Sequence, residues 1–321
     1  MFVYWRMKRK KILRRILWIV LLLFLLMNVS AFMHAYKFTH FSDSVGRKTN
    51  DPTSLSFGAK LKALFLGIDN PRPELTTRPS QPYETLQLQS NKLIECWYIR
   101  NDSSKGTVVL FHGYGGNKSS MLDKSDVFQK LGYSTLLVDF MGSGGSEGNQ
   151  TTIGFSEAEQ VRTVYEYLKK NGEDRIVLFG TSMGAVASLR SIYKYGINPN
   201  GIIIECPFGT LFNTTKARFK SMGVPTFPMA NLLVFWGGIQ NGFQGFSHDA
   251  EKYAKAVQCP SLLLYGEKDE KVSENDIHEI FDNMKGAKAL RIYPNTGHEN
   301  YLVKNENEWT ADVTKFLSEV K

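Results

Sequence analysis

The sequence predicts an α/β fold, in which a mostly parallel central sheet is flanked by helices on both faces. From about residue 83 onward, short apolar runs alternate with stretches of helical periodicity. The apolar runs are continuous, which is typical of strands that are buried on both faces. The 321 residues are 42% hydrophobic and 22% charged, so the chain can build a sizeable core.

Eight segments of the domain are expected to be strands. The first two form an antiparallel pair, and the later ones alternate with helices, which predicts parallel strands joined by right-handed crossovers. The expected strands are 84–89, 93–99, 107–111, 134–138, 175–179, 201–204, 261–265 and 289–293.

Helical spacing recurs between the strands, for example at Val161, Val164 and Leu168. Before the last helix, Asn305 and Glu308 have the spacing of a capping box. Residues 207–247 break the alternation, because they are rich in phenylalanine and interrupted by glycine and proline. We expect them to form a small lid or cap over one edge of the sheet.

The net charge of +8 belongs almost entirely to the N-terminus. Residues 1–15 hold seven lysines and arginines and no acidic residue, and removing those seven from the 39 basic residues leaves 32 against 31 acidic ones. The folded part is therefore nearly neutral. This distribution excludes a nucleic-acid partner on electrostatic grounds.

An unbroken apolar run, 16–27, follows the basic residues. We expect residues 1–33 to be a basic cytoplasmic stub and a transmembrane or signal-anchor helix, because 12–33 supplies the roughly 20 residues that a span requires. The alternative is a signal peptide cleaved near Ala31, which would give a secreted or periplasmic protein. Under both hypotheses, the positive-inside rule places residues 1–15 in the cytoplasm and the rest outside it.

Residues 34–82 are expected to be a juxtamembrane strap that leads to the domain at 83–321. A short amphipathic helix is predicted at 55–66, and four prolines between 71 and 82 favour an extended chain after it. Three cysteines, Cys96, Cys206 and Cys259, have neither disulfide nor metal-site spacing and are expected to be buried thiols. No metal or organic cofactor is implied, and oligomeric state has no signal in the sequence.

A candidate nucleophile, Ser182, stands in the run 180–184 (GTSMG), between a predicted strand and a predicted helix. A turn this tight strains its central residue and crowds its neighbours, so glycines are needed on both sides. The serine hydroxyl would then stand exposed above the sheet, beside the free amide groups of the helix N-terminus.

A serine hydroxyl needs a base to take its proton and an acid to orient that base. His298 follows the last predicted strand and Asp269 follows the strand 261–265, so both should reach the sheet edge where Ser182 lies. Glu205, at the end of the strand 201–204, is the alternative acid. Asp139 also ends a strand, but its glycine-rich continuation favours a structural role.

The remaining histidines are assigned other roles. His248 is expected to be a solvated residue at the start of a helix, and His112 a hydrogen-bonding loop residue. Acyl transfer also requires hydrogen-bond donors for the developing oxyanion. The backbone amides of Tyr114, in the run HGYGG, and Met183 are the candidates.

Residues 83–321 resemble the α/β hydrolases, in particular the serine-aminopeptidase-like and monoacylglycerol-lipase-like proteins. The runs HGYGG, DFMGSGGS, GTSMG, GEKD and TGHE occur here in the order in which that family has them. The resemblance implies the α/β-hydrolase fold and the chain order Ser182, Asp269, His298 for the triad. The chain departs from the family pattern at Met141, where an arginine is common.

Three functions are compatible with these observations. The first is a serine hydrolase that cleaves an ester or thioester of an apolar, lipid-like acyl substrate through an acyl-enzyme. The second is a peptidase of the aminopeptidase type, which an acidic cluster at the pocket mouth would favour. The third is a catalytically inactive, membrane-tethered binding protein, against which the intact triad argues.

Overall fold

Eight strands form one sheet with the order β10-β9-β8-β7-β5-β6-β4-β3 in the computed structural model of the protein, which describes residues 2–42, 58, 62 and 65–320. The pairs β3–β4 and β4–β6 are antiparallel, and the remaining neighbours are parallel. The strands are β3 Glu84–Gln89, β4 Leu93–Ile99, β5 Thr107–Phe111, β6 Ser134–Val138, β7 Ile176–Thr181, β8 Gly201–Glu205, β9 Ser261–Gly266 and β10 Lys288–Tyr293. The predicted α/β class and all eight predicted strands are confirmed.

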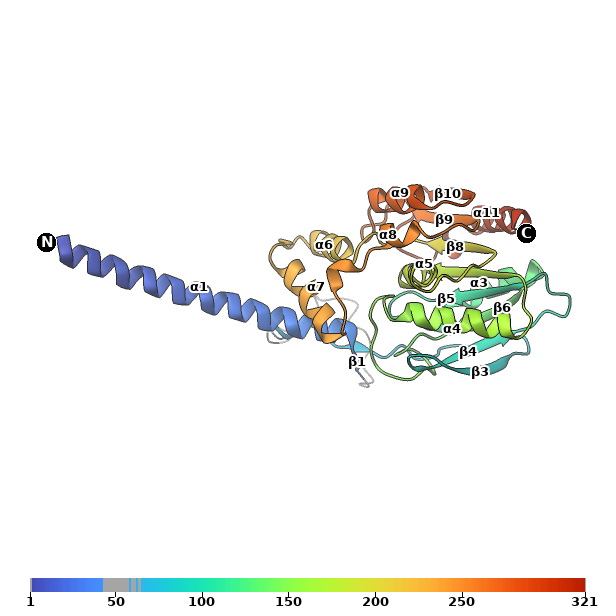
Figure 1. Cartoon of the computed structure of the whole chain (residues 1–321), viewed down its shortest axis with the longest axis horizontal. Coiled ribbons are helices and arrows are strands. Elements are labelled where there is room, and N and C mark those ends of the chain that lie inside the picture. The colour runs from blue at the N-terminus through green and yellow to red at the C-terminus, as the bar shows by residue number, and fades with distance from the viewer. Residues whose placement is uncertain (1, 43–57, 59–61, 63–64, 321) are drawn as a thin grey trace.

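Helices cover both faces of this sheet, as Figure 1 shows. They are α3 Leu122–Lys130, α4 Glu157–Lys170, α5 Met183–Tyr195, α8 Ala250–Ala254, α9 Glu274–Asn283, α10 Tyr301–Lys304 and α11 Glu306–Glu319. In β5, Val109 and Phe111 belong to the core under α4 and α5, whereas Val108 and Leu110 belong to the core under α3 and α11. Both sets are fully buried, which explains why the strand is continuously apolar.

A single long helix, α1 Phe2–Thr39, contains the predicted anchor and continues six residues past residue 33. It is long and apolar enough to cross a membrane, with a mean hydropathy of 2.6 over its most apolar window. After it, β1 Phe41–Ser42 pairs with β2 Asn70–Pro71. The helix predicted at 55–66 lies mostly outside the described residues.

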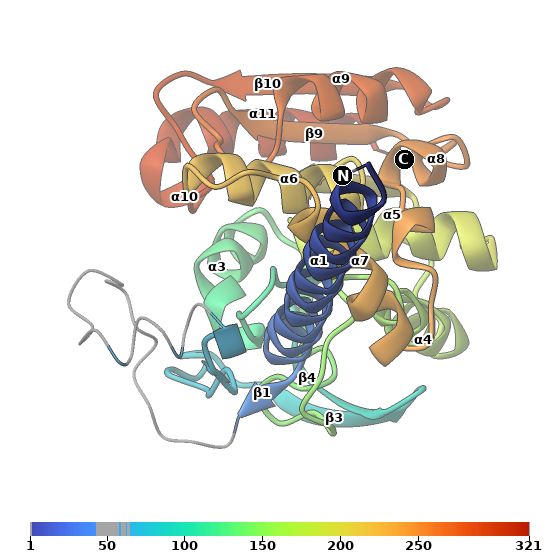
Figure 2. The ribbon, with the colours of Figure 1, turned by 90° about the vertical axis from the view of Figure 1, so that its left-hand side faces the viewer.

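The segment 207–247, which we call the cap, holds two helices, α6 Leu211–Ser221 and α7 Met229–Gln240, and a short 3-10 helix, η3 Gly245–Ser247. Figure 2 shows α6 and α7 beside α1 and in front of the sheet. Thr214 Oγ1 in α6 donates to the carbonyl oxygen of Lys271, just beyond β9. The cap therefore lies over the carboxyl edge of the parallel strands.

Two sequence predictions about individual residues are wrong. His248 is not solvated: it is fully buried, with its ring nitrogens facing the Tyr253 hydroxyl (3.1 Å) and the Ile153 carbonyl oxygen (3.0 Å). Asn305 makes no side-chain cap for α11. Its amide instead donates to Thr296 Oγ1 at 3.1 Å, because the short helix α10 already leads the chain into α11.

Candidate active site

Ser182 lies between β7 and α5 in a backbone conformation that L-residues rarely adopt. Its φ is +51° and its ψ is −108°. The backbone amide of Ser182 donates to the carbonyl oxygen of Glu205 at 2.8 Å, which fastens the turn to the neighbouring strand. A strained residue held by its surroundings at the carboxyl edge of a sheet is typical of a functional position.

The glycines on either side of this turn are required by close packing. A Cβ on Gly180 would lie 2.5 Å from the backbone of Gly184, and a Cβ on Gly184 would lie 2.3 Å from the carbonyl oxygen of Phe111 in β5. No side chain fits at such distances. The pattern therefore has the physical cause that the sequence suggested, and the start of α5 lies against the end of β5.

His298 and Asp269 form a hydrogen-bonded pair at the same edge of the sheet. His298 Nδ1 lies 2.7 Å from Asp269 Oδ2, while Asp269 Oδ1 accepts from the backbone amides of Lys271 (2.8 Å) and Val272 (3.0 Å). The Asp269 side chain is fully buried and that of His298 is 19% exposed. A buried carboxylate with both oxygens occupied can hold the imidazole in one tautomer, with Nε2 free to accept a proton.

Glu205, the alternative acid, is bound elsewhere. Its carboxylate accepts from Trp309 Nε1 at 2.7 Å and from Thr181 Oγ1 at 2.9 Å. Burial raises the pKa of this carboxyl group. Glu205 thus supports the strand below Ser182, and the contact with His298 belongs to Asp269.

The loop after β5 lies directly against Ser182. A Cβ on Gly113 would be 3.6 Å from Ser182 Cβ, and Tyr114 is the next residue of this loop. Met183 opens α5, where the first amides have no acceptor inside the helix. The two candidate oxyanion donors therefore come from two different elements, the loop after β5 and the start of α5.

The side chain of Tyr114 reaches from this loop to the end of α1. Its hydroxyl donates to the carbonyl oxygen of Phe38 at 2.7 Å, and its ring stacks on Phe38 with centroids 4.5 Å apart. The guanidinium of Arg218, in the cap, lies 4.8 Å from the Phe38 ring and 5.9 Å from the Tyr114 ring. The N-terminal helix, the loop beside the serine and the cap thus meet at one aromatic cluster.

Comparison with known proteins agrees with this fold. Residues 102–232 match the family model described as serine aminopeptidase, S33. An esterase from Pyrococcus furiosus superposes with a TM-score of 0.63 at 23% identity, over 75% of this chain and 92% of the esterase. The chain is an α/β hydrolase in fold.

Two curated relatives extend the comparison. The uncharacterized protein YqkD of Bacillus subtilis is 24% identical over 70% of this chain and 75% of its own length. The lysophosphatidylserine lipase ABHD12 of Danio rerio is 25% identical over 60% of this chain, and the match spans about half (51%) of the lipase.

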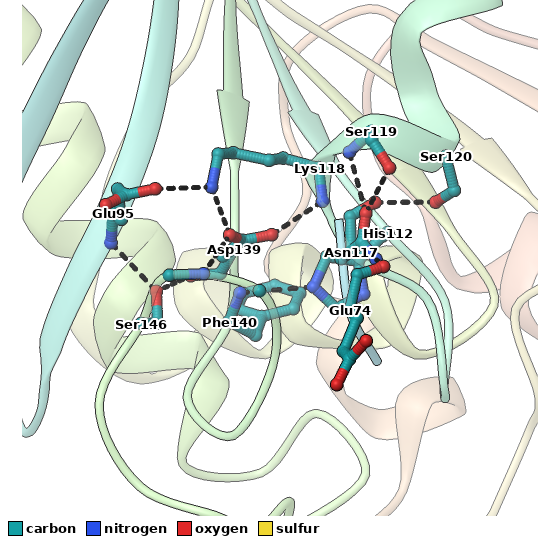
Figure 3. A network of polar contacts seen from close by, with 12 residues as sticks. Glu74, Glu95, His112, Asn117, Lys118, Ser119, Ser120, Asp139, Phe140 and Ser146 are labelled. Carbon is teal, nitrogen blue, oxygen red and sulfur yellow. Dashed lines mark hydrogen bonds and ion pairs between the residues drawn. The ribbon is translucent and has the colours of Figure 1, made fainter. Parts of the chain in front are cut away.

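A buried ion pair lies behind the site, and the sequence motifs did not predict it. Figure 3 shows Lys118 between Asp139 and Glu95: its Nζ bonds to the Asp139 carboxylate and lies 2.8 Å from Glu95 Oε1, and its backbone amide donates to Asp139 Oδ1 at 2.6 Å. His112 accepts at Nε2 from the Phe140 amide at 3.1 Å, as expected of a loop residue. These bonds fix the loop that carries Tyr114 to the loop after β6.

Cys206 is the other residue that the sequence did not assign to the site. Its sulfur, a carboxylate oxygen of Asp269 and a ring nitrogen of His298 lie within 4.8 Å of one another. Burial and the nearby Asp269 carboxylate raise the pKa of the thiol well above its ordinary value, so the sulfur stays protonated. The arrangement is an acid–base pair with a buried thiol beside it. All three cysteines are free and buried, as predicted.

A cleft of about 560 Å³ lies between α6 and the Asp269 loop. It is lined by lysines from the cap, Lys216 and Lys220, and by acidic residues from the opposite side, Glu270 and Asp276. Its charge is therefore mixed. Asp269 lines it as well, so three carboxylates and two lysines border the cleft.

Proposed function

We propose that the protein is a serine hydrolase that cleaves ester or thioester bonds of acyl substrates. The observation that carries the proposal is the His298–Asp269 pair at 2.7 Å, at the sheet edge where the strained Ser182 also lies. A structural serine turn has no need of a buried, oriented acid–base pair beside it.

The mechanism that follows from this arrangement has two halves. Ser182 Oγ attacks the acyl carbonyl carbon as its proton passes to His298 Nε2, and the backbone amides of Tyr114 and Met183 donate to the carbonyl oxygen as it becomes negative. The protonated His298 then gives its proton to the leaving alcohol or thiol, which leaves an acyl-Ser182. Water, deprotonated by His298, releases the acid and restores the serine.

The aromatic residues of the cap give little support for a lipid-like substrate. Several of them pack against the domain: Phe243 stacks on Phe155 at 4.3 Å, and Phe208 lies edge-on to His248 at 5.6 Å. Phe246 packs on Phe212 at 5.6 Å but remains exposed. These contacts build the base of the cap. An apolar acyl substrate is supported instead by the location of the site next to the apolar helix α1.

An uncleaved membrane anchor is part of the same proposal. The candidate cleavage site near Ala31 lies inside the continuous helix α1, and Ala31 is fully buried. In the folded protein this position is covered by the cap helix α7, which uses α1 as a packing partner. We place the basic N-terminus in the cytoplasm and the catalytic domain on the other side of the membrane.

The test is the hydrolysis of p-nitrophenyl esters of increasing acyl length by the full chain in detergent. We expect Ser182→Ala and His298→Ala to lower kcat by about 10³-fold or more. The matched control is Ser188→Ala, because Ser188 lies in α5 and donates only to its own helix, at Gly184 O. Hydrolysis of aminoacyl amides in preference to every ester would favour the peptidase instead. No turnover by folded protein would favour the binding protein.

A further inference from the structure

Large apolar side chains are exposed on the cap. They come from the end of α6, from the connection to α7 and from α7 itself: Met222, Val224, Phe227, Phe235 and Ile239. At 78%, Phe227 is more exposed than any other large apolar side chain in the described residues. We call these five residues the cap tip. Large apolar side chains exposed together on neighbouring segments are typical of an interaction site.

The cap tip adjoins the membrane helix. Trp236 Nε1 in α7 donates to Asn28 Oδ1 at 3.1 Å, Gln240 Nε2 donates to the carbonyl oxygen of Phe32 at 2.8 Å, and the rings of Trp236 and Phe32 meet edge to face at 5.4 Å. Ala31 and Ala35 of α1 are buried. Helix α7 is thus held firmly against the last turns of α1.

The order of these contacts sets the direction of α7. Asn28 meets Trp236 and Phe32 meets Gln240, so the two helices run the same way where they touch. The start of α7 at Met229 then lies farther back along α1, by at most roughly 10 Å at 1.5 Å per residue, because the two helices cross at an angle (Figure 1). Figure 1 shows the α6–α7 connection at the end of the domain from which α1 projects.

The part of α1 that precedes its contacts with α7 is apolar. The residues from Ile16 to Leu26 are all exposed, and none of them carries a charge. A span built from residues 12–33 is about 33 Å long, which matches the hydrocarbon thickness of a bilayer, roughly 30 Å. Its outer end falls at the turns where α7 packs. A cap tip that lies farther back along α1 therefore lies below the surface of the same leaflet.

We propose that the cap tip inserts into the leaflet from which α1 emerges, so that the catalytic domain is held against the bilayer at two points. The occupant of the apolar surface is the acyl-chain region of the membrane lipids. Tyr114, at the end of β5, bonds to Phe38 at the end of α1. The edge of the sheet that carries Ser182 therefore faces the membrane. An acyl substrate can then reach the site directly from the bilayer. Only this inference about the substrate rests on the proposed hydrolase function.

The test is depth-dependent quenching of a fluorophore on the full chain in lipid nanodiscs. Because the native cysteines are buried, Phe227→Cys can be labelled selectively with NBD. We expect doxyl groups in the lipid acyl chains to quench it and aqueous iodide to leave it largely unquenched. The control is Asp174→Cys, at a fully exposed side chain just before β7, where iodide should quench and doxyl lipid should not. Equal iodide quenching at both sites would overturn the proposal.

A second measurement separates docking from catalysis. In Phe227→Asp we expect the ratio of rates on a bilayer-borne and a water-soluble ester to fall about tenfold, with Phe227→Leu retaining the wild-type ratio. An unchanged ratio in Phe227→Asp would overturn the supply of substrate from the bilayer. If wild-type protein hydrolyses neither ester, the hydrolase proposal fails, and the quenching result still decides the docking.

Discussion

Replacing Asp269 by asparagine perturbs the proposed acid–base pair with little change in size. The two carboxylate oxygens have different partners: Oδ1 accepts from the amides of Lys271 and Val272, and Oδ2 faces His298 Nδ1. In Asp269→Asn the amide oxygen stays with the two backbone donors, so the NH₂ group faces His298. Nδ1 must then accept, and the proton moves to Nε2, the atom that has to take the proton of Ser182.

The expected loss follows from these contacts. A hydrogen bond to a charged group contributes about 1.5–3 kcal/mol, or roughly 10- to 150-fold in rate. The wrong tautomer adds to this, because Nε2 can no longer act as a base. We expect kcat to fall by about 10³- to 10⁴-fold. KM should change little, since the Asp269 side chain is buried behind His298.

The assay is hydrolysis of a short water-soluble ester by detergent-solubilised protein. Glu205→Gln is the matched control, since glutamine can still accept from Trp309 and donate to Thr181 Oγ1, and we expect its kcat to stay within tenfold of wild type. The assignment of the acid is refuted if Asp269→Asn stays within tenfold while Glu205→Gln falls.

Three further predictions concern other parts of the molecule. Tyr114→Phe removes the hydrogen bond to Phe38, worth about 1 kcal/mol, and should lower kcat roughly fivefold with KM unchanged; an unaltered kcat would contradict the role of this contact. Gly184→Ala puts a methyl group 2.3 Å from Phe111 O and should lower the free energy of unfolding by about 3 kcal/mol or more, which would appear as a lower Tm. A wild-type Tm would contradict the packing argument. Burial lowers the pKa of His248 to about 4, below its unfolded value, so the unfolded state binds the proton first and stability should fall, by up to about 3 kcal/mol, from about pH 6.5 to 4. In urea unfolding at pH 7 and pH 4.5, the free energy of unfolding of His248→Gln should depend less on pH than that of wild type. An equal pH dependence in the two proteins would contradict this role of His248.

The strands of the sheet were predictable because strands buried on both faces consist of continuous apolar runs in the sequence. Ser182 and its flanking glycines were predictable for a similar reason, since the tight turn permits few residue types. The preference for Asp269 over Glu205 could not be derived from spacing alone. Both residues end strands at the same sheet edge, and only the hydrogen bonds of Glu205 to Trp309 and Thr181 show that its carboxylate is engaged elsewhere.

Contacts between segments far apart in the sequence were not predictable. Nothing in the sequence pairs Lys118 with Asp139, or Tyr114 with Phe38, because each depends on how loops meet in space. His248 was expected to be solvated because it stands at the start of a predicted helix. The structure buries it, and only tertiary packing against Ile153 and Tyr253 supplies the partners that make burial tolerable.

The most direct test of the central claim is labelling by a fluorophosphonate probe followed by mass spectrometry of the labelled peptide. An activated serine forms a stable phosphonate adduct, and we predict one adduct, on Ser182. It should disappear in Ser182→Ala and be strongly reduced in His298→Ala, while Ser188→Ala labels like wild type. An adduct on another serine, or none on folded wild-type protein, would contradict the proposal that Ser182 is an activated nucleophile.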